Sequence, residues 1–247
     1  MMDTKCLNCN SISINNYCSV CGQSNSTHRF SLKHFFLHDF LHGVFHLDKG
    51  FLFTLKELFT RPGHSIREYM QGKRREHFNY FTLLILIYAI GHFLARIPEV
   101  TYNEIMAQSL DAKGQVRVIR DYGKLAALVG IPFYALATYW VFLKSKQNYT
   151  EHLVLTMYFT SAIFLIHYIP VIFTFFTQDA GTLANVQRVV NSSEYVYYYW
   201  FLYQYFSAFN YSKTGLILRC LLAIFSIFVV ALLLFIAMDV IGKKFLL

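Results

Sequence analysis

Five apolar runs of roughly membrane-spanning length follow one another in the C-terminal two-thirds of the chain. They are residues 79–97, 123–143, 153–176, 195–212 and 216–238. A helix needs about 20 predominantly apolar residues to cross the hydrocarbon core of a bilayer. Only 15% of all residues are charged, against about a quarter in ordinary soluble domains. The sequence therefore predicts an all-α polytopic membrane protein with about five transmembrane helices.

The fourth run decides whether five or four helices cross the membrane. Residues 195–212 are uncharged but rich in tyrosine, and such aromatic residues favour the membrane interface. An in-plane helix therefore competes with a span. We favour a span, because it places Lys213 in the cytoplasm and residues 177–194 in a loop outside, and it leaves the C-terminus outside. In the third run, Pro170 is expected to kink the helix.

Two pairs of cysteines mark the N-terminus, and each pair has the spacing CxxC. They are Cys6 and Cys9, then Cys18 and Cys21. Two residues between cysteines let one tight turn direct both thiolates at one ion, and two such turns complete a four-sulfur zinc shell. A redox pair or disulfides are the alternative. Gly22 follows the second pair, and glycine adopts the positive φ that such a turn requires; Asn10 is the next best residue after the first pair.

The head, residues 1–25, is expected to lie in the cytoplasm. Its first residues contain no apolar segment, so we expect no cleavable signal peptide. In the reducing cytoplasm, paired cysteines bind metal more often than they form disulfides. A closed four-sulfur shell has no open position, so the zinc is expected to be structural. So short a segment cannot build a sufficient core, and the metal would supply most of its folding free energy.

Residues 26–78 are predicted to form amphipathic helices on the membrane surface, ahead of a transmembrane domain at 79–247. The first helix, 31–47, carries one face of Phe and Leu and a second face of histidines at i, i+4 spacing. The histidines are His34, His38, His42 and His46. They form the hydrated face of an interfacial helix, a secondary metal site or a pH sensor; the sequence leaves these three interpretations open.

A second amphipathic helix, 51–60, ends at Arg61-Pro62-Gly63, where the chain is expected to bend. Ser65 is then expected to cap a short helix, with Glu68 as its capping-box partner. Basic residues that contact anionic lipid headgroups are predicted around this bend and just before the first span. They are Arg61, Arg67, Lys73, Arg74 and Arg75. The net charge of +8 does not lead us to expect nucleic-acid binding, because no recognition fold accompanies it.

These motifs resemble the bacterial domain-of-unknown-function family 3667. The matching residues are Cys6, Cys9, Cys18, Cys21, Gly22, Gln23, Lys49-Gly50-Phe51, Thr54-Leu55, Leu58, Arg61-Pro62-Gly63, Ile66-Arg67-Glu68-Tyr69 and Gly72-Lys73-Arg74. This chain departs from the family pattern at two positions. Asn10 occupies a position where the family usually has glycine, which is a mild change. Tyr80 follows Asn79 where the family often has proline, so the resemblance does not predict a kink at the start of the first span. The resemblance implies a multi-pass bacterial membrane protein of unestablished activity.

Inside the predicted spans, His92 and His167 form a candidate intramembrane polar site. The sequence contains no HExxH, phosphate-binding glycine loop or GxSxG, which favours a binding protein over an enzyme. We predict a scaffold in the bacterial cytoplasmic (inner) membrane whose zinc-binding head and interfacial helices dock a cytoplasmic protein, lipid headgroups or a second copy. The alternative is a small ion or proton transporter, or a membrane enzyme, that uses the histidines.

Overall fold

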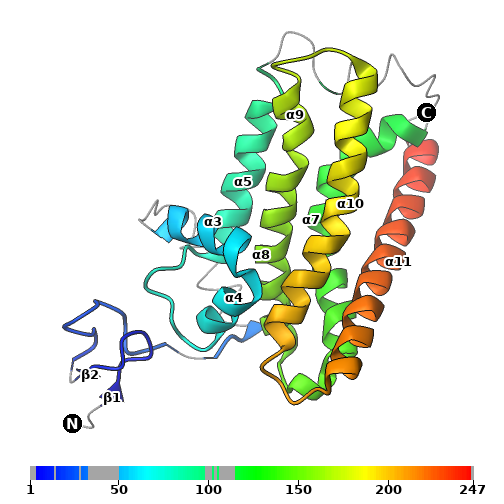
Figure 1. Cartoon of the computed structure of the whole chain (residues 1–247). Helices are drawn as coiled ribbons and strands as arrows, with labels where there is room; N and C mark the ends of the chain where they lie inside the picture. Colours follow the sequence, from blue (N-terminus) through cyan, green and yellow to red (C-terminus); the bar gives the residue numbers. More distant parts are fainter. Residues whose placement is uncertain are drawn as a thin grey trace.

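The computed structural model describes residues 4–13, 15–27, 29–32, 50–97, 102, 105 and 115–245. A small head at the N-terminus precedes a helical bundle, as Figure 1 shows. The head contains two short antiparallel strands, β1 (Thr4–Lys5) and β2 (Ile12–Ser13), with Thr4 opposite Ser13. Apart from these strands and an isolated bridge between Tyr17 and Ser24, the regular elements of the described chain are helices. The predicted mostly helical fold with an N-terminal cysteine cluster is thus confirmed.

The long helices of the described chain run alternately up and down the bundle (Figure 1). They are α5 (Tyr80–Leu94), α7 (Gln115–Val141), α8 (Tyr149–His167), α10 (Ala180–Phe206) and α11 (Lys213–Phe245), and the short α9 (Ile169–Phe173) continues α8. The head lies at the end of the bundle where α5 and α8 begin, and α11 finishes at the opposite end.

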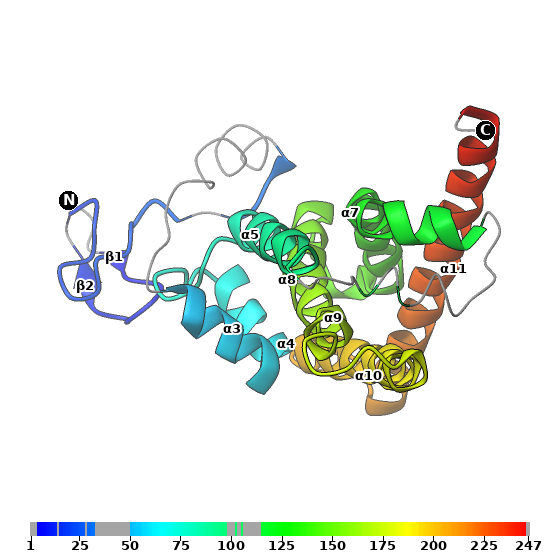
Figure 2. The ribbon, with the colours of Figure 1, turned by 90° about the horizontal axis from the view of Figure 1, so that it is seen from above.

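Helix α8 is the centre of the bundle. It contacts α5, α7 and α10, and Figure 2 shows it between α5 and the other long helices. Every residue from Thr150 to Phe164 is buried. Its first turn carries a capping box, in which Asn148 and Glu151 each accept a hydrogen bond from the other's backbone N–H.

Two stretches of the described chain are long and apolar enough to cross a membrane, Tyr149–Phe173 and Lys213–Ala237. The helices Tyr80–Leu94 and Ala126–Val141 are apolar but shorter. Five transmembrane helices are therefore not confirmed, although all five predicted runs lie in helices of the bundle. The predicted kink in the third run corresponds to the break between α8 and α9, at Tyr168, two residues before Pro170.

The predicted loop 177–194 is wrong for most of its length. Asp179 caps α10 by accepting a hydrogen bond from the N–H of Thr182, and the helix continues without a break to Phe206. Residues 182–206 contain neither proline nor glycine, so the helix that starts in the polar first half continues into the aromatic second half. In the same way, α7 begins at Gln115, eight residues before the predicted second run at 123–143.

Two short helices, α3 (Gly50–Thr60) and α4 (Pro62–Met70), lie against the head end of the bundle (Figure 1). Ser65 is not the N-cap that the sequence predicts. Helix α4 begins three residues earlier with Pro62, whose fixed φ suits the first helical position. Ser65 instead lies inside the helix, and its Oγ is 2.8 Å from Nε2 of His77.

Phenylalanines of α3, which the sequence predicts in the membrane interface, contact protein side chains. The rings of Phe51 and Phe78 are 5.5 Å apart, and Phe59 lies 6.0 Å from Tyr197 of α10. Leu52 is the most exposed apolar side chain of α3, at 74%. The predicted helix 31–47 and its four histidines, His34, His38, His42 and His46, lie outside the described residues except for its first two positions.

Candidate metal centre and its seat on the bundle

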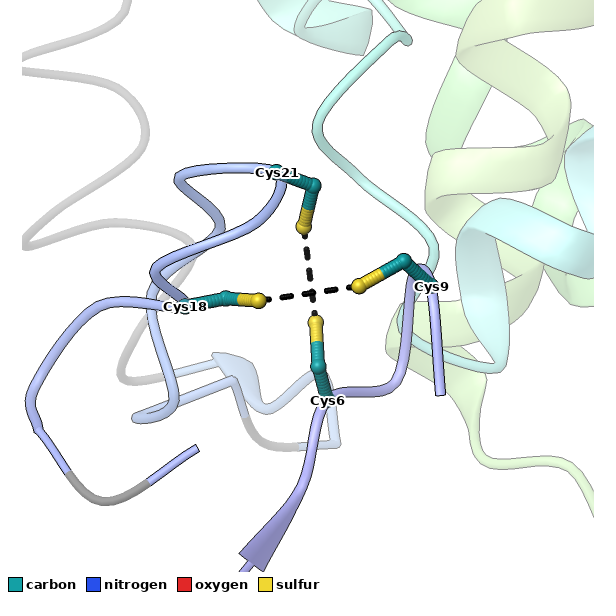
Figure 3. A group of neighbouring side chains, drawn as sticks. All are labelled: Cys6, Cys9, Cys18 and Cys21. Atoms are coloured by element: carbon teal, nitrogen blue, oxygen red, sulfur yellow. Dashed lines mark hydrogen bonds between the residues drawn. The ribbon is translucent and has the colours of Figure 1, made fainter. Parts of the chain in front are cut away.

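The four paired cysteines converge on one point, as Figure 3 shows. All four Sγ atoms lie within 4.8 Å of one another. Sγ of Cys6 is 3.5 Å from that of Cys21, and Sγ of Cys9 is 3.6 Å from that of Cys18. Tetrahedral zinc with sulfur at about 2.3 Å requires about 3.8 Å between sulfurs, whereas a disulfide requires about 2.05 Å. The arrangement therefore fits a metal ion, and all four cysteines are free thiols.

The two CxxC turns have the same backbone hydrogen bonds. The N–H of Asn10 donates to the carbonyl of Cys6 at 2.9 Å, and the N–H of Gly22 donates to the carbonyl of Cys18 at 2.8 Å. Asn10 has φ of 61° and Gly22 has φ of 74°. The left-handed conformation predicted after each pair is thus confirmed, and it lets each turn direct both of its thiols inward.

A serine that sequence analysis did not single out lies against the thiols. Ser11 Oγ is 2.9 Å from Sγ of Cys9 and 3.1 Å from Sγ of Cys18. Its hydrogen bond lowers the pKa of the Cys18 thiol to about 6 and also lowers the pKa of Cys9. Because thiolates bind metal and thiols do not, Ser11 favours the form that binds a metal ion.

Gln23 joins the head to the bundle. Its Nε2 donates to the carbonyl of Gly72 at 2.9 Å, and its Oε1 accepts from the N–H groups of Arg74 and Arg75 at 3.0 and 3.2 Å. The side chain is buried, so these bonds are shielded from water. We call residues 72–75 the seat of the head.

Two further contacts fit the head to the seat. Arg75 Nε donates to the carbonyl of Cys21 at 2.9 Å. Gly72 has φ of +107°, and a Cβ at this position would lie only 2.6 Å from Cδ1 of Leu7. Glycine is therefore favoured at position 72 by its backbone conformation, and a larger residue would also displace the end of the Leu7 side chain in the first CxxC turn.

A second attachment connects the segment after the head to the start of α8. Arg29 donates from Nε and Nη2 to the two carboxylate oxygens of Glu151, at 2.7 and 2.8 Å. Asn148 Nδ2 donates to the carbonyl of Phe30 at 2.9 Å. The buried ring of Phe30 lies 4.0 Å from the guanidinium carbon of Arg74. The head is thus held by the seat and by the N-terminus of the central helix.

The predicted headgroup-binding residues contact protein groups. Arg67 Nη1 donates to the carbonyls of Gln204 and Tyr205, at 2.8 and 2.9 Å, and so satisfies carbonyls at the C-terminal end of α10. Gly63 makes this contact possible, because a Cβ there would lie 2.3 Å from the backbone N of Tyr205. Arg61 pairs with Glu68 at 3.1 Å, as Lys73 does at 3.8 Å. Binding of these residues to lipid remains a prediction.

The two predicted intramembrane histidines have different surroundings. His92 is exposed on α5. His167, at the end of α8, lies 3.0 Å through Nε2 from Oε2 of Glu194 on α10. Sequence analysis missed Glu194, because it was assigned to a loop. It also missed His152, which is completely buried at the start of α8 with Nδ1 3.1 Å from Thr138 Oγ1.

Comparison with known proteins supports the resemblance seen in the sequence. Residues 48–90 match the family described as "Protein of unknown function (DUF3667)". The match begins just before α3, runs through α4 and the seat, and ends in the last turns of α5. No curated protein and no solved structure matched the chain. The family match thus covers the segment that joins the head to the bundle.

Proposed function

We propose that this chain is an integral protein of the bacterial cytoplasmic membrane. In this proposal a zinc-stabilised head is held in a fixed position at the cytoplasmic end of the bundle and docks a cytoplasmic protein. The observation that supports it best is the seat, where Gln23 makes three hydrogen bonds with residues 72–75. A head attached in this way presents one surface in one orientation, so less freedom is lost when a partner binds.

The outer surface of α11 supports the membrane location. Exposed Leu, Ile and Phe side chains follow one another along this helix, and only 17% of the most apolar part of Lys213–Ala237 is buried. Soluble monomers rarely expose apolar patches of more than a few hundred Å². Lipid is the medium that would cover such a surface.

Basic residues at the head end of the bundle support a cytoplasmic head. Lys144 and Lys146 lie between α7 and α8, and Lys213 and Arg219 lie at the start of α11. Lys144 Nζ and the guanidinium carbon of Arg219 lie 5.8 and 5.1 Å from the ring centre of Tyr211. Cytoplasmic flanks of transmembrane helices carry an excess of Lys and Arg, and these residues share the end at which the seat lies (Figure 1).

Zinc is the metal we propose for the four-cysteine centre. Four thiolates at tetrahedral spacing suit zinc, which keeps no open coordination position in such a shell. Cys6, Cys9, Cys18 and Cys21 would hold it, and the Ser11 hydroxyl would hydrogen-bond to two of the sulfurs. The metal would stabilise the head, in whose described residues the buried apolar side chains are the cysteines Cys6 and Cys18.

The free surface of the head favours a protein partner. Ile12, Tyr17 and Val20 are 61%, 64% and 72% exposed, and exposed apolar side chains on so small a unit suit a protein interface. Anionic lipid is less favoured as the partner, because Arg67, Arg74 and Arg75 already donate to protein carbonyls or lie on aromatic rings.

The test is photo-crosslinking in intact cells with a photoreactive amino acid at position 20 of the full-length chain. We expect a crosslink to a cytoplasmic protein that disappears with I12S and Y17S while the zinc content stays at about one per chain. L52S, which changes an equally exposed residue on α3, should leave the crosslink intact. Crosslinks only to lipid or to a second copy, or a crosslink that survives I12S and Y17S, would contradict the proposed partner.

A further inference from the structure

Two cationic side chains lie over the ring of Tyr211, in the segment that joins α10 to α11. Lys144 comes from the short 3₁₀ helix Leu143–Ser145 after α7, and Arg219 comes from the second turn of α11. A third cation, the exposed Lys213, begins α11 two positions after Tyr211. The link between α7 and α8 and the start of α11 lie at the same end of the bundle (Figure 1). Three positive charges therefore share this corner of the protein.

The ring of Tyr211 is held in place by the bundle. Its hydroxyl donates to the carbonyl of Phe142 at 3.1 Å. Phe142 is completely buried, and its ring stacks on that of Phe206 at the end of α10, with 3.6 Å between the ring centres. Lys144 and Arg219 thus lie against a fixed support, so less freedom is lost when they bind a ligand.

No carboxylate balances these charges within the described residues. Lys144, Lys213 and Arg219 form no ion pair there, whereas Arg29 pairs with Glu151 and Lys73 pairs with Glu68. An aromatic ring attracts a cation but does not neutralise its charge. The corner around Tyr211 therefore keeps a surplus of positive charge, which attracts anions.

The corner also contains hydrogen-bond donors for an oxyanion. Nη1 of Arg219 donates to the carbonyl of Gly215 at 3.2 Å, and Ser212 Oγ accepts from the N–H of the same glycine at 3.2 Å. A guanidinium has five N–H donors, so most of those of Arg219 stay available, and so does the hydroxyl proton of Ser212. Arginine with several free donors suits a phosphate group.

An apolar surface continues from this corner along α11. Leu218, Leu222 and Phe225 are 61%, 52% and 62% exposed, and their spacing places them on one face of the helix. From Lys213 to Phe225 the helix rises about 18 Å, at 1.5 Å per residue. One leaflet of a bilayer contributes about 15 Å of hydrocarbon. A molecule with both an anionic head and an acyl chain would therefore fit this surface.

We propose that Lys144, Lys213 and Arg219 bind the phosphate of an anionic phospholipid in the cytoplasmic leaflet, with an acyl chain along α11. The proposal rests on the membrane location proposed above. Arg219 and the Ser212 hydroxyl donate to the phosphate oxygens, and the two lysines balance its charge. An ammonium on the headgroup would add a positive charge to a site that already has three, so the site favours phosphatidylglycerol over phosphatidylcholine. These residues differ from Arg61, Arg67 and residues 73–75, which the sequence predicts as headgroup-binding.

The test measures lipid binding to the purified full-length protein by native mass spectrometry in a neutral detergent. Phosphatidylglycerol and phosphatidylcholine with the same acyl chains are added in turn, and we expect phosphatidylglycerol to bind about tenfold more tightly. K144Q and R219Q should each weaken its binding about fivefold, since each removes one charge from the site. R219K, which keeps the charge, should weaken it less than R219Q.

K73Q is the matched control. Lys73 also lies at the head end, but its charge is paired with Glu68 at 3.8 Å, so K73Q should leave phosphatidylglycerol binding unchanged. Thermal unfolding of each variant verifies its fold. Lys144 is exposed, so K144Q tests the site even if R219Q does not fold.

Four outcomes would overturn the site. Equal binding of the two lipids, in a protein that needs detergent, removes it and leaves the membrane location and the docking function untouched. Losses in K73Q as large as in K144Q would replace it with a diffuse basic surface. Glycerol 1-phosphate that binds as tightly as the lipid would show that the ligand is a soluble phosphate. A protein that stays soluble without detergent contradicts the membrane location itself, and the lipid site with it.

Discussion

In the described part of the chain, two stretches could cross a membrane by length and composition: α8 with its continuation α9, and α11; they differ sharply in how much of them protein buries. The most apolar part of Tyr149–Phe173 is 72% buried, whereas that of Lys213–Ala237 is 17% buried. Helix α11 is the more apolar of the two. In the proposed membrane location lipid would cover the exposed side chains of α11, whereas every residue of α8 from Thr150 to Phe164 is buried by protein.

The comparison explains where polar groups occur in this fold. Buried polar residues of α8 include Glu151, His152, Thr156 and Ser161. Each would be costly next to lipid, but in α8 they find partners on the head, on α7 or in their own helix. Hydropathy is therefore highest in the helix that protein covers least, while the buried ionisable groups Glu151 and His152 lie on the less apolar helix.

Removal of the metal should have the largest effect of these changes, and it should destabilise the start of α8 but leave α11 unaffected. C18S is expected to reduce the zinc content from about one per chain to near zero and to unfold the head. Hydrogen exchange should then rise at the N-terminus of α8, which the Arg29–Glu151 pair connects to the head, and stay unchanged in α11. Equal exchange changes in both helices would contradict an attachment that is specific to α8.

A truncation inside α8 should cost far more than the same truncation in α11. Ile163 of α8 is 7% exposed and Ile236 of α11 is 49% exposed. I163A should lower the free energy of unfolding by about 3 kcal/mol, since it leaves a cavity in a packed core. I236A should cost less than about 1 kcal/mol. Thermal unfolding in the same detergent compares the two, and similar losses would show that α11 is packed against protein after all.

The metal site could be predicted from the sequence because its determinants are local. The spacing of Cys6 and Cys9 specifies one turn, and Asn10 supplies the positive φ that closes it. The seat could not be predicted, because Gln23 binds residues 72–75, about fifty positions away. No sequence periodicity relates Gln23 to residues 72–75. The family resemblance includes Gln23 and residues 72–74 but does not indicate that they are in contact.

The polar site in the bundle was missed for a different reason. Glu194 was assigned to a loop because it follows a polar segment, yet α10 continues through that segment. His152 was placed before the third apolar run, because its neighbour Glu151 is charged. Both errors come from treating polar residues as the ends of helices. In this fold, side-chain caps mark where the two helices begin: Asn148 with Glu151 for α8, and Asp179 for α10.

Low pH should lower the free energy of unfolding through His77, whose imidazole contacts α4. Burial lowers the pKa of His77 to about 4, whereas an unfolded chain has a value of about 6.5. Between these values the unfolded chain binds a proton that the folded chain does not, so stability falls as the pH falls through this window. From about pH 7 to pH 5 the loss should be about 2 kcal/mol.

The H77Q variant measures how much of this loss of stability at low pH is due to His77. The imidazole lies 2.8 Å from Ser65 Oγ and 5.5 Å from the ring of Tyr69, which in turn contacts Tyr158 of α8. Unfolding curves of the wild type and H77Q at the two pH values give the difference directly. A wild-type loss no larger than that of H77Q would show that this histidine is solvated in the folded protein.

The smallest expected effect concerns one carboxylate at the start of α8. Glu151 is 6% exposed, accepts both donors of Arg29 and caps the N–H of Asn148 at 2.8 Å. In E151Q the amide NH₂ would face the Arg29 donors, and one acceptor would be lost. We expect the free energy of unfolding to fall by about 1 kcal/mol, the usual cost of a lost cap. S226A on α11 removes a hydroxyl whose hydrogen bond, within the described residues, goes to the carbonyl of Leu222 in the same helix. It should change the free energy of unfolding by less than about 0.5 kcal/mol. If S226A costs as much as E151Q, the polar groups of the buried helix α8 are no more important for stability than those of the exposed helix α11.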